Sequence, residues 1–244
     1  MKNVLSPKLI LFANKVAKVP LVKTILKPLY YPYKRWINSK RNKMFLTNGV
    51  TVISDFHNCF EENSLTYTLA FGTMLGAVRE HGFIKHDLDL DVFVWAEDYS
   101  PNIQLILEAN GFRLEHSFII DEGKSGREET YSKMGVSIDI FYIYPPIDTY
   151  QYTCDFSPFP DCVTWEDSQN KKGGVRSRRI EIPISKDRVQ ILCEGVNLYV
   201  PANYDEFLRF RYGDDYMIPN PKWQNGENPH IIEWKDKKAQ FKNY

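Results

Sequence analysis

The chain has 244 residues, of which 43% are hydrophobic and 25% are charged, and its formal net charge at pH 7 is zero. This composition predicts one good hydrophobic core, enough for a single domain and an accessory segment, and the chain contains no internal repeat or low-complexity tract. The charge is unevenly distributed, with eleven Lys or Arg and no acid in residues 1–54, and the acidic remainder argues against nucleic acid as a partner.

The basic segment, residues 1–43, is the first predicted element and has the apolar periodicity of an amphipathic helix. It contains no apolar run near the ~20 residues that a membrane-spanning helix needs, and lysines interrupt the apolar centre that a signal peptide needs. We therefore expect a cytoplasmic protein whose basic arm lies on the anionic inner face of a membrane. The alternative is a pair of helices that packs on the body or forms a dimer contact. Residues 44–244 are expected to form the folded domain.

A strand, a glycine turn and a helix are predicted next. Residues 64–71 (SLTYTLAF) are β-prone, and Gly72 interrupts this run. Residues 73–81 have helical composition, and Gly82 supplies a stop. A helix N-terminus at a glycine turn presents free backbone N–H groups and the positive end of the helix dipole to a phosphate. The sequence therefore predicts a phosphate-binding turn at Gly72 and Thr73.

Arg79 lies two turns into this predicted helix. From there, its guanidinium group can reach a phosphate oxygen in a bidentate contact. The alternative is a surface salt bridge with Glu80 or Asp87.

Three aspartates alternate with apolar residues in the run HDLDLDVFVW. On a β-strand, Asp87, Asp89 and Asp91 point to one face, so that face is a row of carboxylates and the other face is core. Charges spaced so closely repel one another unless a hard cation neutralises them, and we expect Mg²⁺ or Mn²⁺. Acids that charge an exposed edge strand are one alternative. A calcium loop is the other, but its sixth position requires glycine and here holds Val92.

Residues 100–120 predict a helix followed by a strand. Ser100 is a good N-cap, Pro101 suits the first helical position, and Gly111 follows the end of the helix. Residues 121–127 predict a polar turn.

Asp139 is the one charged residue in the next β-prone run, GVSIDIFYIY. An unpaired charge inside such an apolar run is costly. Because two aspartates of one strand that bind a catalytic metal usually need a third carboxylate, we expect Asp139 to complete the site. The alternative is a buried acid satisfied by an arginine or by backbone donors.

Cys154 and Cys162 lie in a stretch that is expected to be a loop. A zinc site is possible there, but no histidine stands at ligand spacing beside them. Free thiols in a reducing cytoplasm are the expected state.

Three arginines are expected in an exposed loop ahead of two strands, at residues 180–185 and 189–200. A contact with a phosphate or an anionic acceptor is the alternative for these residues, Arg176, Arg178 and Arg179.

Three segments of the chain resemble the hallmark blocks of the LicD/fukutin family. They are Gly72–Val94, the IDIF around Asp139 and Phe207–Trp223, and they occur in matching order within about residues 44–223. The resemblance implies an α+β, nucleotidyltransferase-like fold, in which a mixed sheet is flanked by helices and carries the N-terminal helical arm. It also implies transfer of a phospho-alcohol, such as phosphocholine or ribitol phosphate, from a CDP-linked donor. The acceptor would be a hydroxyl of a cell-surface glycan or of its lipid-linked precursor, and CMP would be released.

The resemblance also implies roles for the acids. Asp89 and Asp91 would hold the divalent ion at the donor diphosphate. Asp139 would ligate the same ion while it orients or deprotonates the acceptor hydroxyl. Asp87 and Arg79 are the other expected catalytic residues. The donor phosphate is expected to contact three residues, Gly72, Thr73 and Arg79.

Two positions depart from the family pattern, which usually reads Trp-Asp-Asp-Asp-hydrophobic-Asp. Leu88 replaces an acid, but it is expected to point away from the carboxylates, so the change bears on the choice of donor or acceptor. His86 replaces the tryptophan and is expected to pack or to contact substrate, with a proton shuttle as the alternative.

The late segment places a glycine turn, residues 212–215, after a helix predicted at residues 204–211. The resemblance suggests that this turn faces the substrate, and an ordinary surface loop is the alternative. The sequence leaves two other functions open. One is a nucleotidyltransferase that leaves the nucleotide on its acceptor, and the other is a catalytically silent, membrane-associated scaffold of the same fold.

Overall fold

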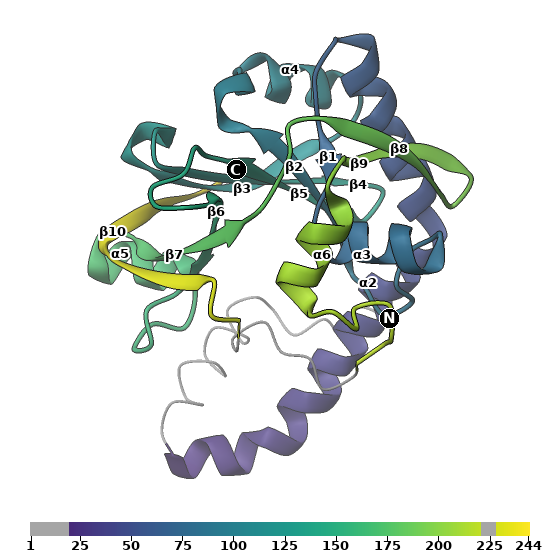
Figure 1. The fold of residues 1–244 in the computed structure, drawn as a ribbon. Helices are drawn as coiled ribbons and strands as arrows, with labels where there is room; N and C mark the ends of the chain where they lie inside the picture. The colour runs from purple at the N-terminus through teal and green to yellow at the C-terminus, as the bar shows by residue number, and fades with distance from the viewer. Residues whose placement is uncertain (1–19, 221–227) are drawn as a thin grey trace.

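The computed structural model describes residues 20–220 and 228–244 (Figure 1). Its centre is an eight-stranded mixed sheet with the strand order β1-β2-β5-β4-β3-β10-β7-β6, and β8 and β9 form a separate hairpin. The expected α+β class is therefore confirmed. The strands are β1 (Thr68–Leu69), β2 (Asp89–Trp95), β3 (Arg113–Ile120), β4 (Gly126–Lys133), β5 (Val136–Ile143), β6 (Gln151–Ser157), β7 (Val175–Ile182), β8 (Arg188–Cys193), β9 (Val196–Pro201) and β10 (Ile231–Asn243). The helices are α2 (Pro20–Glu62), α3 (Phe71–Glu80), α4 (Asn102–Ala109), α5 (Trp165–Lys172) and α6 (Tyr204–Tyr212), with 3-10 turns at Ala96–Asp98 and Asp121–Gly123.

The long helix α2 joins the basic segment to the body. Among its described side chains, Phe45 is the first that is buried, and the helix contacts β2, β5, β9 and α4. Figure 1 shows its N-terminal end standing away from the sheet. The expected boundary between residues 43 and 44 falls inside this helix, and residues 1–19 of the expected arm lie outside the described residues.

No helix in the described part of the chain is both long enough and apolar enough to cross a membrane.

The two central strands carry the expected acids. Strands β2 and β5 pair in parallel, and their register places Asp91 beside Asp139. On the opposite face of these strands, Leu90, Val92 and Ile138 are fully buried. Strand β2 therefore has one acid-bearing face and one core face, as its alternating sequence predicts.

Helices α3 and α6 cover the acid-bearing face next to the acids. The rings of Phe71 from α3 and Phe207 from α6 lie 5.0 and 5.7 Å from the ring of Phe93 on β2. Phe71 also lies 5.0 Å from Phe141 on β5. Aromatic pairs at these distances stabilise packing by about 0.5–1.5 kcal/mol each beyond their buried area. This cluster fixes the N-terminus of α3 and the body of α6 beside the acids.

Two predicted elements shift in position. We had expected Asp87 to lie in the strand. Strand β2 begins at Asp89, however, so Asp87 lies in the preceding loop. The β-prone run at residues 64–71 forms only the two-residue edge strand β1, because α3 already begins at Phe71. The backbone N–H of Ala70 bonds the carbonyl oxygen of Asp91 at 3.0 Å, which ties this turn to β2.

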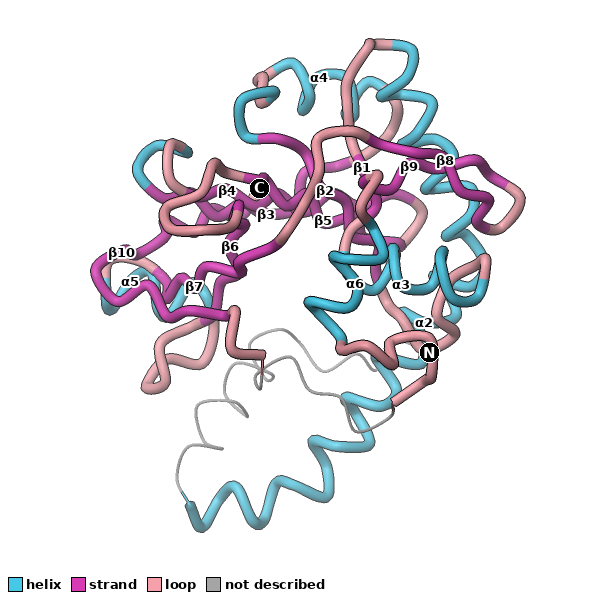
Figure 2. The backbone as a smooth tube through the Cα atoms, viewed as in Figure 1, coloured by secondary structure: helices cyan, strands magenta, loops and turns pink. Residues whose placement is uncertain are grey.

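The prediction of an exposed arginine loop is wrong, because the three arginines lie within β7. Strands β10, β7 and β6 form the end of the sheet opposite β1 and β2, away from α3 (Figure 2). There, acids from neighbouring segments neutralise each guanidinium group: Glu233 pairs with Arg176, Asp155 with Arg178 and Asp148 with Arg179. The run expected as one strand at residues 189–200 is the hairpin of β8 and β9, which turns at Glu194 and Gly195.

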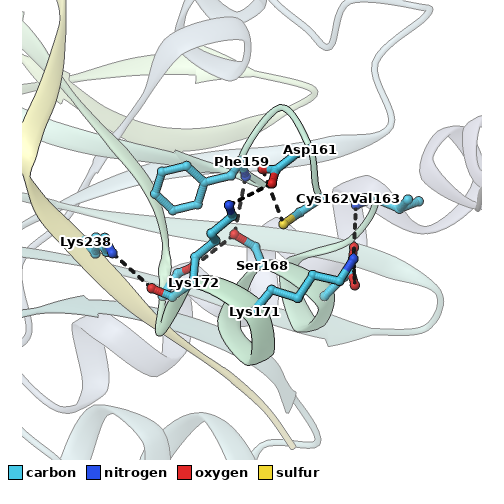
Figure 3. Close-up of polar contacts among 10 residues, drawn as sticks. Phe159, Asp161, Cys162, Val163, Ser168, Lys171, Lys172 and Lys238 are labelled. Carbon is cyan, nitrogen blue, oxygen red and sulfur yellow. Dashed lines mark hydrogen bonds and ion pairs between the residues drawn. The ribbon is translucent and has the colours of Figure 1, made fainter. Parts of the chain in front are cut away.

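Both Cys154 and Cys162 were expected in a loop. Cys154 lies within β6 instead, whereas Cys162 does lie in a loop, the one before α5. That loop is braced to α5 by an ion pair of 2.7 Å between Asp161 and Lys172 and by the hydroxyl of Ser168, which bonds backbone groups on both sides (Figure 3). All four cysteines are free thiols and buried. Among the described residues, no group of three His, Cys, Asp or Glu side chains is arranged to complete a zinc site with them.

Candidate active site

Four aspartates gather on the acid-bearing face, and we call Asp87, Asp89, Asp91 and Asp139 the acid row. Burial raises the pKa of Asp91 well above its usual value, and the nearby charges of the other three raise it further. Burial also raises the pKa of Asp139 to about 7 and that of Asp87 to about 6. The structure thus brings the four acids predicted from the sequence into one electrostatically coupled cluster.

The acid row has little cationic compensation. Among the described residues, Arg41 of α2 is the one cation in ion-pair contact with it, at 3.5 Å from a carboxylate oxygen of Asp89. Both side chains of this pair are more than 40% exposed. Solvent-exposed pairs of this kind contribute only about 0–1 kcal/mol. Within the described part of the chain, the other three acids of the row therefore have no cation in ion-pair contact.

The N-terminus of α3 faces Asp91, and Gly72, predicted to stand in a turn before this helix, lies in its first turn. The backbone N–H of Gly72 hydrogen-bonds the Asp91 carboxylate, and the Thr73 hydroxyl accepts a bond of 2.8 Å from the backbone N–H of Asp91. A Cβ atom at position 72 would lie only 3.4 Å from a carboxylate oxygen of Asp87, so glycine keeps this space open. The hydroxyl of Thr73 holds β2 in place, and its contact with a phosphate stays a prediction.

A cleft of about 480 Å³ opens beside the acid row, with Gly72 and Asp87 in its lining. Arg79 forms part of its wall, although its guanidinium group also makes the alternative salt bridge with Glu80 at 2.8 Å. The Arg79 side chain is only 11% exposed, and its Nε atom is buried without a hydrogen-bond partner among the described residues. A second guanidinium nitrogen donates to the carbonyl oxygen of Tyr216 at 3.4 Å, so the contact of Arg79 with a phosphate stays a prediction.

The late glycine turn contributes to the same cleft. Helix α6 ends at Tyr212, one residue beyond the predicted end, and Tyr212 and Asp215 line the cleft together with His86. Asp214 does not line it: its side chain is 94% exposed and lies 3.6 Å from Arg209. Of the two acids in this turn, only Asp215 is therefore placed to meet a ligand.

Asp139 is held by a hydroxyl group, and not by an arginine or by backbone donors. Thr130 of β4 donates a hydrogen bond of 2.7 Å to Oδ1 of Asp139, and Nε2 of His116 lies 3.1 Å from the same hydroxyl oxygen. Because the Thr130 proton is committed to Asp139, the histidine is the donor in its own contact. Burial lowers the pKa of His116. Sequence reasoning missed Thr130, since the β4 sequence GREETYSK shows no apolar alternation, and it missed His116, which reaches Thr130 from β3.

Helix α2 also reaches the site, although Arg41 and Asn42 were assigned to the arm. The amide group of Asn42 donates bonds of 2.9 Å to the carbonyl oxygens of Lys85 and Asp87. These bonds hold the loop that carries the first acid of the row. These two hydrogen bonds could not be predicted from a local sequence pattern, because Asn42 and its partners are 43 and 45 residues apart.

The fit of a divalent ion can be judged from the donor set. Among the described residues, no three His, Cys, Asp or Glu side chains are already grouped as a complete metal site. The acid row does offer several oxygen ligands with little cationic compensation, which suits Mg²⁺ or Mn²⁺. Such ions are commonly held by one or two carboxylates, with phosphate oxygens and water as the other ligands. The expected ligand set of Asp89, Asp91 and Asp139 stays a prediction.

Comparison with known proteins identifies the family of the chain. Residues 64–203 match the family described as LicD/FKTN/FKRP, nucleotidyltransferase domain. The chain belongs to this LicD family. It is 23% identical over 195 residues to the ribitol-5-phosphate transferase FKTN of Mus musculus, a match that covers 80% of this chain and 37% of the mouse protein. It is 36% identical over 50 residues to the lipopolysaccharide cholinephosphotransferase LicD of Haemophilus influenzae, which covers 20% of this chain and 19% of that protein.

The chain spans about a third of the length of the FKTN proteins that it matches. The LicD-family match contains the whole acid row, Gly72 and Thr130. It ends before Tyr212 and Asp215 and begins after Arg41. These three residues therefore join the site through the fold of this chain, outside the matched region.

Proposed function

We propose that this chain transfers a phospho-alcohol from a CDP-linked donor to a hydroxyl of a cell-surface glycan or its lipid-linked precursor, and that it releases CMP. The observation that carries the proposal is the acid row, in which Asp91 and Asp139 stand side by side with little cationic compensation, next to a cleft that contains Arg79. Phosphoryl transfer needs little covalent chemistry from a protein and depends mainly on positioning and charge neutralisation. Membership of the LicD family supports the same class of reaction.

Mg²⁺ or Mn²⁺ is the proposed cofactor, with Asp89, Asp91 and Asp139 as its protein ligands. An ion bound there supplies positive charge to the donor diphosphate and to the departing CMP. The protein contributes the register of β2 and β5, which sets Asp91 beside Asp139. The bonds from Gly72 and to Thr73 keep Asp91 in that position.

The donor is proposed to enter by the cleft between α3 and the end of α6. Arg79 is placed to donate to a phosphate oxygen from the cleft wall, and Gly72 leaves room for the phosphate near the acid row. Tyr212 and Asp215 line the part of the cleft that is built by the late turn. The apolar part of the lining, which includes Leu75 and Ile84, is suited to exclude water from the donor.

Asp139 is proposed as the general base. Its pKa of about 7 matches the requirement that a base be partly free of its proton at neutral pH, and Thr130 fixes its orientation. The acceptor oxygen attacks the phosphorus that carries the alcohol, and the bond from this phosphorus to the oxygen of CMP breaks. The hydroxyl proton of the acceptor passes to Asp139.

The experiment that tests the function is incubation of the full chain with a panel of CDP-alcohols and Mg²⁺ or Mn²⁺, with CMP release and transfer to a glycan followed together. The proposal expects one CDP-alcohol to yield both CMP and a phosphodiester-modified glycan. A glycan that carries the nucleotide would identify a nucleotidyltransferase instead. No turnover and no divalent-metal binding would identify a silent scaffold.

The basic arm is proposed to dock the enzyme on the anionic inner face of a membrane. In the described part of α2, Lys34, Arg35 and Lys40 are exposed, and the ammonium group of Lys40 lies 3.8 Å from the centre of the Trp36 ring. Basic residues with exposed aromatic rings are suited to the headgroup region.

The docking proposal is tested by sedimentation with anionic liposomes. Removal of residues 1–40 should release the protein, while a soluble acceptor analogue is still modified at a similar rate. Salt should release the intact chain only partly, because screening weakens the charge term but not the apolar contact. Failure of the intact chain to sediment at low salt would assign the arm to the fold or to an oligomer contact.

A further inference from the structure

Two neighbouring acids of β4, Glu128 and Glu129, point to opposite faces of the sheet, and both are more than 90% buried. Glu129 accepts bonds from Arg127 at 2.9 Å and from the hydroxyls of Tyr131 and Tyr142 at 3.1 Å each. Glu128 makes no hydrogen bond or ion pair with any of the described residues. Burial of a carboxyl group without hydrogen-bond partners is costly. The partners of Glu129 offset this cost, whereas Glu128 has no such partner among the described residues.

Glu128 shares its face with the acid row. In the register of the sheet it lies opposite Phe141 of β5, one pleat from Thr130, which lies opposite Asp139. The charges that act on Glu128 are those of Asp139, Asp155 and Asp91, and with burial they raise its pKa well above the usual value. No cation is among them. The carboxylate therefore lies near the base of the proposed reaction, in a place where an added hydrogen-bond donor would be stabilising.

The donor cleft does not extend to β4. Its lining comes from α3, from the loop before β2 and from the segment at and after the end of α6, and it meets the acid row at Gly72 and Asp87. Asp139 is bonded from the β4 side by Thr130. A donor in the cleft and an acceptor next to Asp139 would therefore occupy different sides of the acid row, and Glu128 lies on the acceptor's side.

We propose that Glu128 binds the acceptor by accepting hydrogen bonds from hydroxyl groups of a sugar or another polyol. A carboxyl group has two oxygens that accept hydrogen bonds and, while it holds its proton, one O–H donor, so two neighbouring hydroxyls of one ring can satisfy it without adding charge. A polyol is thus the class of ligand that removes the cost of the unpaired acid beside three other acids. The assignment rests on the proposed function for the reaction that follows binding, but not for binding itself.

The kinetic test compares Glu128→Gln with the matched control Glu129→Gln. For Glu128→Gln we expect the KM for the glycan acceptor to rise about tenfold, as loss of a hydrogen bond between the carboxyl group and a sugar hydroxyl implies. The KM for the CDP-alcohol should change less than about twofold. The rate of slow CDP-alcohol hydrolysis, measured as CMP release without acceptor, should also change less than about twofold. Glu129→Gln should leave the acceptor KM unchanged. An unchanged acceptor KM in Glu128→Gln, or an equal loss in acceptor-free CMP release, overturns the proposal.

Two measurements that need no turnover separate this inference from the proposed function. The first is saturation-transfer NMR of the full chain with methyl glycosides of glucose, galactose, mannose and N-acetylglucosamine. Binding to the unmodified chain that is lost in Glu128→Gln supports the assignment, even if no CDP-alcohol reacts, and absence of binding to the unmodified chain overturns it. The second is thermal unfolding: Glu128→Gln should melt no lower than the unmodified chain, whereas Glu129→Gln should melt lower. A lower melting temperature for Glu128→Gln would show that the acid is structural.

Discussion

Two parts of the same sheet treat charged side chains in opposite ways. Across β6, β7 and β10, Arg176 makes bonds of 2.8 and 2.5 Å to Glu233, and Arg178 makes an equivalent pair of bonds to Asp155. On β2 and β5, the acids crowd one another with only Arg41 in ion-pair contact among the described residues. Charge density in a strand is therefore a poor guide to a functional site. Acids without matching cations are the better guide, and the predictions below test this contrast.

The largest effect is expected from the acids of β2. Asp89→Asn or Asp91→Asn should lower turnover at least about a hundredfold, because a few kcal/mol of charge stabilisation in the transition state is lost. Folding should survive, since removal of a repelling charge relieves the crowded row. CMP release at saturating Mg²⁺ or Mn²⁺ measures the first effect, and thermal unfolding measures the second. Turnover near that of the unmodified chain in either variant would contradict the metal assignment.

Asp139→Asn should abolish transfer while it weakens donor binding less than the two changes on β2. A base acts mainly in the transition state, whereas a ligand of the donor-bound ion acts in the ground state as well. Calorimetric titration with a CDP-alcohol gives the order of the three affinities. Equal losses in all three variants would make Asp139 a simple ligand.

The crowded acids should also give the metal-free chain an unusual pH dependence. The pKa values of Asp87 and Asp139 in the folded chain are about 6 and 7, above the ordinary value of 3.8. The unfolded chain therefore loses these protons at lower pH, so stability from the protonated acids is complete below pH 3.8 and is lost as pH rises through 6 and 7. Urea unfolding in EDTA should show this fall. Mg²⁺ or Mn²⁺ should restore stability at pH 7, and a flat profile in EDTA would refute the crowding.

The smallest effect is expected in the paired part of the sheet. Arg176→Gln breaks a bidentate pair with Glu233 whose side chains are 29% and 32% exposed. The free energy of unfolding should fall by about 1 kcal/mol, as expected for a half-exposed pair of good geometry. Turnover should be unchanged. A loss of CMP release in this variant would mean that the paired arginines take part in the reaction after all.

The sequence predicted those parts of the site that are built from local patterns. The alternation of Asp89 and Asp91 with apolar residues and the isolated Asp139 stand where their patterns placed them, whereas Gly72 lies inside the first turn of α3 and not in a turn before it. Helices α4 and α6 also begin and end near the expected residues. These features depend on spacing within one segment, which a single sequence displays directly.

The features that were missed depend on partners far along the chain. Strand β7 reads as a polar loop because its arginines become acceptable in a sheet only when Asp155 and Glu233 are brought beside them. Strand β4 reads as polar because GREETYSK shows no apolar alternation, and Thr130 and Glu128 were missed with it. Asn42 reaches the loop of the acid row from a helix that appears in the sequence only as a basic arm.

The register of the parallel strands β2 and β5 decides whether Asp91 and Asp139 lie side by side. A slip of two residues would keep every apolar side chain on its own face, so hydrophobic burial by itself does not forbid it. Such a slip would set Asp91 beside Ser137 or Phe141 and separate the two carboxylates. The hydroxyls of Thr73 and Thr130 hold Asp91 and Asp139 on either side of this seam. Thr73 of α3 and Thr130 of β4 thus fix the two acidic residues from the neighbouring elements, in addition to the backbone register of β2 and β5.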